Sequence, residues 1–94
     1  MEIKFASSKG SLYIYLHGEL DEYNAKTAKT EIENAIASSG NLKRVIFNFA
    51  NTSFMDSTGI GVLLGRYKML KKIGVPIYTV SYTHLRAHET GRNL

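Results

Sequence analysis

Apolar and polar residues alternate along the first part of the chain. Ile3 and Phe5 have polar neighbours, residues 7–10 carry a turn signal, and three apolar residues then recur at every second position: Leu12, Ile14 and Leu16. A period of two is typical of strands with one buried face, and two short strands joined tightly predict a β-hairpin with Tyr13 and Tyr15 on its outer side. Residues 18–22 break the alternation and predict a loop.

The pattern then changes to helical spacing and back. Apolar residues over 24–38 recur with a helical period, and a second amphipathic helix is predicted over about 57–73. Residues 43–49 between them are almost continuously apolar, which predicts a central strand buried on both faces. Residues 76–80 predict a last strand. Together these elements predict an α/β fold, a mixed β-sheet of about four strands covered by helices.

Length, charge and cysteine content exclude several classes of protein. The 94 residues are enough for one small domain. The net charge of +4 is spread along the chain, and its basic doublets at 43–44 and 71–72 are too sparse for a nucleic-acid stripe. The absence of cysteine excludes disulfides and a thiol nucleophile. No apolar run reaches the ~18–20 residues of a membrane span and no signal peptide is evident, so we expect a cytoplasmic protein.

The candidate chemistry lies in residues 51–61, where a strand is followed by a helix. Asp56, Ser57 and Thr58 fall at the start of the predicted helix. The first N–H groups of a helix lack internal partners and the helix dipole is positive there, so this turn can hold an anion such as a phosphate. The alternative is a structural helix cap, in which Asp56 or Ser57 accepts a hydrogen bond and Gly59 permits a tight turn.

The run Ser53 to Lys68 (SFMDSTGIGVLLGRYK) resembles the signature of the STAS-domain family, and most closely the bacterial anti-sigma factor antagonists of the sporulation type. Residues 18–21 also resemble the loop after that family's second strand, and the resemblance covers about residues 3–80. It implies an incomplete STAS-like domain over 1–80. It also implies a partner, an anti-sigma factor with ATP-dependent serine kinase activity. In such proteins the first hydroxyl after the Asp accepts the phosphate, here Ser57, with Thr58 as the second candidate.

The resemblance also implies that Asp21 lies beside the phosphorylation turn and helps to form a partner surface. From the residues alone Asp21 could equally be a loop acid or the cap of the first helix, and at least one of Phe54 and Met55 is expected in the core. The full partner surface that we predict consists of Glu19, Asp21, Asp56, Ser57, Thr58, Gly59, Ile60 and Gly61.

We expect no enzyme, because two acids beside one hydroxyl lack a third catalytic group. No cofactor is expected, and no nucleic acid or membrane as a partner. Two alternative functions stay open: a regulatory STAS module of another signalling system, and a weak nucleotide-binding protein.

The tail over residues 81–94 does not match the family. Residues 80–90 resemble a peptide that recurs where translated environmental reads run into adapter DNA, so we exclude the tail from functional reasoning; the alternative is a divergent native terminus. His84 and His88 lack a third ligand nearby, so we expect no metal site. The helix, strand and helix that end the family's domain are missing, which predicts an exposed sheet edge and self-association.

Overall fold

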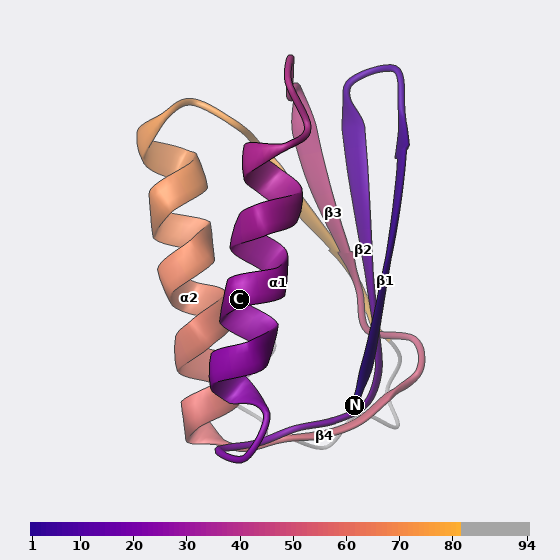
Figure 1. Ribbon diagram of the computed structural model, residues 1–94, viewed down its shortest axis with the longest axis vertical. Helices are drawn as coiled ribbons and strands as arrows, with labels where there is room; N and C mark the ends of the chain where they lie inside the picture. Colours follow the sequence, from indigo (N-terminus) through magenta and orange to yellow (C-terminus); the bar gives the residue numbers. More distant parts are fainter. Residues whose placement is uncertain (82–94) are drawn as a thin grey trace.

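The computed structural model describes residues 1–81, which form one sheet with two helices on the same face (Figure 1). The five-stranded sheet has the order β1-β2-β3-β5, and β4 pairs with β2 beyond the end of β3. Among the strands of residues 1–81, β1 and β2 are antiparallel and the other neighbouring pairs are parallel. The elements are β1 (Glu2–Ser8), β2 (Ser11–Leu20), α1 (Ala25–Ala37), β3 (Arg44–Asn48), β4 (Thr52–Met55), α2 (Ser57–Lys72) and β5 (Ile77–Val80). The predicted mixed sheet covered by helices is confirmed, and β4 is an additional strand.

The prediction of a loop over residues 18–22 is wrong for its first half, because β2 continues to Leu20. The last residues of β2, from Gly18 to Leu20, pair in parallel with β4 instead of β3. Gly18 lies opposite Thr52, and Leu20 lies opposite Met55. The register shifts between Gly18 and Glu19, and Gly18 has a φ of 100°. A glycine tolerates this left-handed conformation, which lets the strand bend and continue rather than stop.

The hydrophobic core lies between the sheet and the two helices. Alternate residues of β2 and β3 point toward the helices, and Ile32 of α1 and Leu70 of α2 are fully buried against them. The prediction that β3 is buried on both faces is wrong, because Val45 and Phe47 are buried but Ile46 is only half-buried. The physical reason is that both helices cover the same face of the sheet (Figure 1).

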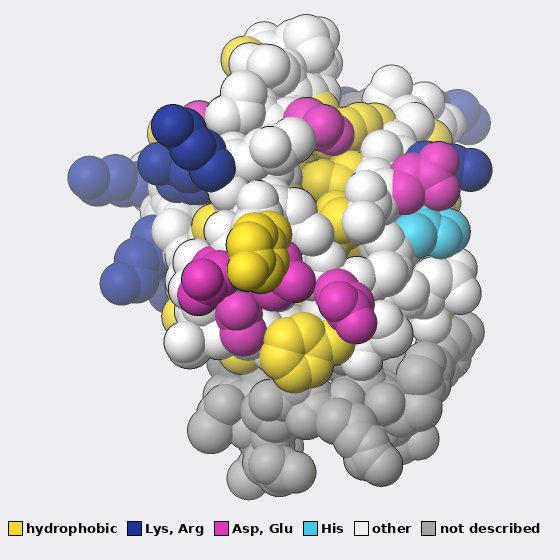
Figure 2. All heavy atoms as spheres, turned by 60° about the horizontal axis from the view of Figure 1, so that its bottom comes forward, with side chains coloured by type: hydrophobic (Ala, Val, Ile, Leu, Met, Phe, Trp, Pro, Cys, Tyr) yellow, Lys and Arg dark blue, Asp and Glu magenta, His cyan; other side chains and the backbone are white. Residues whose placement is uncertain are grey.

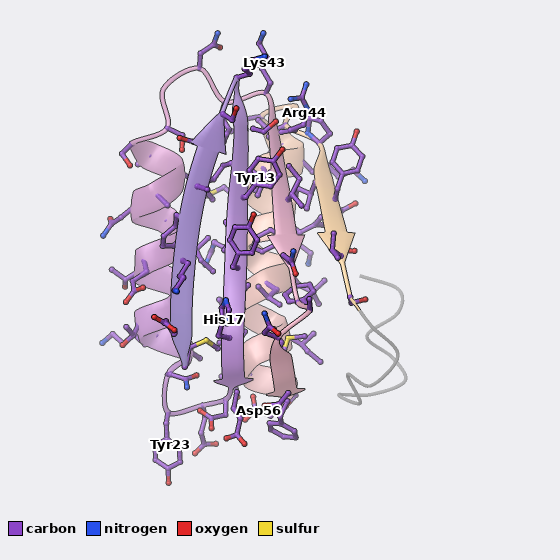
Figure 3. The ribbon with its side chains drawn as sticks, turned by 90° about the vertical axis from the view of Figure 1, so that its right-hand side faces the viewer. Tyr13, His17, Tyr23, Lys43, Arg44 and Asp56 are labelled. Carbon is purple, nitrogen blue, oxygen red and sulfur yellow. The ribbon has the colours of Figure 1, made fainter. Side chains whose placement is uncertain are left out.

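The other face of the sheet carries the tyrosines that the alternation placed outside. The rings of Tyr13 and Tyr15 stack with their centroids 6.5 Å apart, and Figure 3 looks onto this face of β2. Both side chains are half-buried, as residues on a partly covered sheet surface are. Their predicted position on the outer side of the hairpin is confirmed.

Neither α1 nor α2 combines the length and the apolar character that a membrane-spanning helix requires. The predicted tail, apart from Ser81, and the histidine pair within it lie outside the described residues. Self-association through the edge of the sheet stays a prediction.

Candidate functional site

The site is centred on Asp56, the residue between β4 and α2. Asp56 has extended backbone, and its Oδ1 accepts a hydrogen bond from the N–H of Gly59 at 2.9 Å. Its Oδ2 accepts a second hydrogen bond, from the N–H of Glu22 at 3.1 Å. The carboxylate therefore caps α2 and also holds the loop that follows β2, a segment 34 residues away in sequence. The structural alternative, a helix cap formed by Asp56, is confirmed.

Ser57 and Thr58 are the first two residues of α2, and both are exposed. The first turn of a helix presents unpaired N–H groups and the positive end of the dipole, so added negative charge is favourable there. A hydroxyl at this position can be reached by another protein and can carry a phosphate beside the helix end.

The next three residues of α2 differ in accessibility. Gly59 is buried, and a Cβ at this position would overlap the backbone oxygen of Leu20. Gly59 therefore belongs to the packing of α2 on the end of β2, which corrects its predicted place on the partner surface. Ile60 is half-buried and packs against the core, whereas Gly61 is exposed with no atom within 4 Å of an added Cβ. Of these three, Gly61 is the one turned fully outward.

The loop between β2 and α1 is held by its own side chains. Oδ1 of Asp21 accepts hydrogen bonds from the N–H groups of Tyr23 at 3.1 Å and Asn24 at 3.4 Å. The side chain of Asn24 makes two hydrogen bonds. Its Oδ1 accepts from the N–H of Asp21 at 2.9 Å, and its Nδ2 donates to the backbone carbonyl of Glu19 at 2.9 Å. Asp21 is half-buried and its carboxylate accepts hydrogen bonds within the loop, so of the two structural alternatives it is the loop acid, and the N-cap of α1 is Asn24. The same loop is held against α2 by the bond from Glu22 to Asp56.

Acidic side chains gather beside hydrophobic ones (Figure 2) at the end of the molecule where both helices begin (Figure 1). The acidic members, called here the acidic surface, are Glu19, Asp21, Glu22 and Asp56, half of the eight acidic residues of a chain with net charge +4. Two aromatic side chains are exposed beside them, Tyr23 at 90% and Phe54 at 45%. In Figure 3 Tyr23 projects from the loop away from the sheet, and Asp56 lies at the end of β4.

The predicted surface did not include Glu22, Tyr23 or Phe54. Phe54 lies opposite Glu19 in the register of β2 and β4, while the next residue, Met55, is buried in the core. The expectation that one of Phe54 and Met55 is in the core is therefore confirmed for Met55. Recognition of β4 as a strand would have assigned these two side chains to opposite faces.

Within residues 1–81, no group of three His, Cys, Asp or Glu side chains is arranged to hold an ion. The oxygens of Asp21 and Asp56 instead accept backbone hydrogen bonds.

Comparison with known proteins gives one family. The sequence model described as the STAS domain matches residues 2–83. An anti-sigma F factor antagonist from Paenibacillus polymyxa is 32% identical over 74 residues, which are 79% of this chain and 62% of that protein. An anti-sigma-B factor antagonist from Bacillus subtilis (strain 168) is 30% identical over 74 residues, again 79% of this chain and 65% of that protein. The chain thus spans less than two thirds of the length of these relatives.

Solved structures give the same fold. The anti-sigma factor antagonist SpoIIAA in its unphosphorylated form matches with a TM-score of 0.71 and 29% identity, covering 98% of this chain and 79% of that chain. The phosphorylated form of SpoIIAA, described as a Bacillus cell fate determinant, matches with a TM-score of 0.68 and 29% identity, covering 98% of this chain and 78% of that one.

Proposed function

This chain belongs to the STAS-domain family, and from that premise we propose that it acts as an anti-sigma factor antagonist that is switched off by phosphorylation of Ser57. Its partner is an anti-sigma factor with serine kinase activity, and the unmodified chain binds that factor so that the sigma factor is released. The relatives support the role of anti-sigma factor antagonist, because two proteins that are identical to this chain at about a third of the aligned positions carry that name. The chain itself is a substrate and a binding partner rather than an enzyme.

One observation supports the choice of Ser57 above all. The cap of α2 is made by Asp56, whereas Ser57 is the exposed first residue of the helix. Modification of Ser57 therefore leaves the hydrogen bond between Asp56 and Gly59 in place. The fold can carry the phosphate, and the change is confined to the surface that a partner meets. Thr58 is the second candidate because it is also exposed.

The strength of such a switch follows from charge. A phosphate adds about −1.5 to −2 charges, which must lose water if the surface is covered by a partner. A penalty of ~3 kcal/mol weakens binding more than a hundredfold, because each 1.4 kcal/mol is a factor of ten. The helix terminus itself favours the added charge. The phosphate therefore opposes the complex without unfolding the domain.

The experiment uses the anti-sigma F factor that the Paenibacillus polymyxa relative antagonises. The chain is incubated with this factor and ATP, and mass spectrometry locates the modified residue in the wild type, Ser57→Ala and Thr58→Ala. We expect phosphate on the wild type and on Thr58→Ala, and none on Ser57→Ala. Calorimetric titration should then show that Ser57→Asp binds at least ~100-fold more weakly than Ser57→Ala. Equal affinities for these two variants would contradict the proposal.

A further inference from the structure

Tyr23 and Phe54, called here the aromatic pair, are exposed on the same end of the molecule as Ser57. Tyr23 is 90% exposed and Phe54 is 45% exposed. Single exposed apolar residues are common on protein surfaces and need no explanation. These two are different because both adjoin the acidic surface, Tyr23 next to Glu22 in the loop and Phe54 opposite Glu19 across the β2–β4 ladder.

The backbone that presents Tyr23 is fixed before any partner arrives. The N–H of Tyr23 donates to Oδ1 of Asp21 at 3.1 Å, and the N–H of Glu22 donates to Asp56 at 3.1 Å. A tyrosine side chain has only two rotatable angles, so little conformational entropy is lost when it is covered. A large ring on an ordered loop is thus prepared for binding at low cost.

We propose that the aromatic pair inserts into apolar recesses of a protein partner whose surrounding surface is basic. The inference rests on the proposed function, since that partner is the anti-sigma factor. Exposed aromatic rings with charged groups around them have the arrangement of an interface hot spot, in which a few buried rings supply most of the affinity and a polar rim excludes water.

The charge of this surface selects the class of partner. The acidic surface places four carboxylates around the aromatic pair, although the whole chain has a net charge of +4. Nucleic acids and anionic membranes attract basic patches, and four carboxylates repel their phosphates. A protein that presents arginine or lysine around an apolar recess is complementary in both charge and polarity.

The test is a binding titration with the whole 94-residue chain. The probes are the anti-sigma F factor of Paenibacillus polymyxa and the anti-sigma-B factor of Bacillus subtilis, with ADP in place of ATP so that no phosphate is transferred. The variants are Tyr23→Ala, Tyr23→Phe and Phe54→Ala. The matched control is Tyr78→Ala, which removes a ring that is 55% exposed on β5, on the outer face of the sheet.

We expect Tyr23→Ala to weaken binding by about 30-fold or more, the effect of truncating a hot-spot residue. Phe54→Ala should weaken it by about tenfold, with an unchanged circular dichroism spectrum and melting temperature showing that the domain is folded. Tyr23→Phe and Tyr78→Ala should stay within about threefold of the wild type, because the first keeps the ring and the second lies away from the acidic surface.

Two results would overturn the inference in different ways. If the wild type binds but Tyr23→Ala and Tyr78→Ala have the same affinity, the contact does not use the ring, and the proposed function stands without it. If the wild type binds neither factor, the proposed function fails, and the inference fails with it.

Discussion

The N–H of Glu22 donates a hydrogen bond to Oδ2 of Asp56 at 3.1 Å and so joins the start of α1 to the start of α2. The other oxygen of the same carboxylate caps α2 through Gly59. One side chain therefore fixes both the helix that presents Ser57 and the loop that presents Tyr23. This explains how residues from distant parts of the sequence form one continuous surface.

The first prediction concerns this carboxylate. Asp56→Ala removes a helix cap, which is worth about 1 kcal/mol, and a further hydrogen bond worth about as much. We expect the free energy of unfolding to fall by about 2 kcal/mol, measured by urea denaturation. Asp56→Asn should lose roughly half of this, because the amide oxygen can still accept one of the two bonds. An unchanged midpoint for Asp56→Ala would show that neither bond matters to stability.

The second prediction compares two glycines of the same helix. A Cβ at Gly59 would overlap the backbone oxygen of Leu20, so Gly59→Ala must push α2 away from β2, at a cost of about 2 kcal/mol. Gly61 is exposed, and an added Cβ there would have no atom within 4 Å. Gly61→Ala should therefore stabilise the fold by up to about 1 kcal/mol through helix propensity. Thermal unfolding of both variants measures the difference, and effects of equal sign would contradict it.

Much of the fold could be predicted from local pattern. Alternation predicted the hairpin of β1 and β2, and helical spacing predicted α1 and α2. The strand β2 and both helices bury one face of their own sequence, whereas in β1 only Ile3 is half-buried and the other residues are exposed. The strand β4 was missed because it has only four residues, with burial at its first and last positions rather than in alternation. Its pairing with the end of β2 is a long-range contact that no local pattern shows.

The site could be predicted only where it is local in sequence. Asp56 and Ser57 are adjacent, so capping rules were sufficient to place Asp56 at the start of α2, and family resemblance selects Ser57 as the proposed phosphorylation site. The aromatic pair of Tyr23 and Phe54 is formed by tertiary structure, because the two residues lie on the same surface only when β4 pairs with β2. Gly59 was misplaced because sequence cannot tell a glycine that contacts a partner from one that packs on its own chain.

The third prediction concerns Thr52, which is fully buried in β4. Its hydroxyl donates to the carbonyl of Leu16 at 2.7 Å and thereby ties β4 to β2. Thr52→Val keeps the shape but leaves that carbonyl without this donor, so the free energy of unfolding should fall by about 1–2 kcal/mol. The control is Thr79→Val, an exposed position on β5 that should change stability by less than about 0.5 kcal/mol. Equal chemical denaturation midpoints for the two variants would contradict a structural role for the hydroxyl.

The fourth prediction concerns the rate of association with the proposed partner, an anti-sigma factor. Exposed charges at the rim of an interface act mainly by steering the encounter, so Glu22→Gln should slow association by about two- to fivefold and change dissociation little. The matched control is Glu31→Gln, which removes the same charge from an exposed position on α1. Stopped-flow measurements at low and physiological salt should show the effect shrinking as salt increases, because the Debye length falls from about 30 Å at 0.01 M to about 8 Å at 0.15 M. If Glu31→Gln slows association as much as Glu22→Gln does, only the net charge of the chain matters, and the acidic surface does not direct the partner.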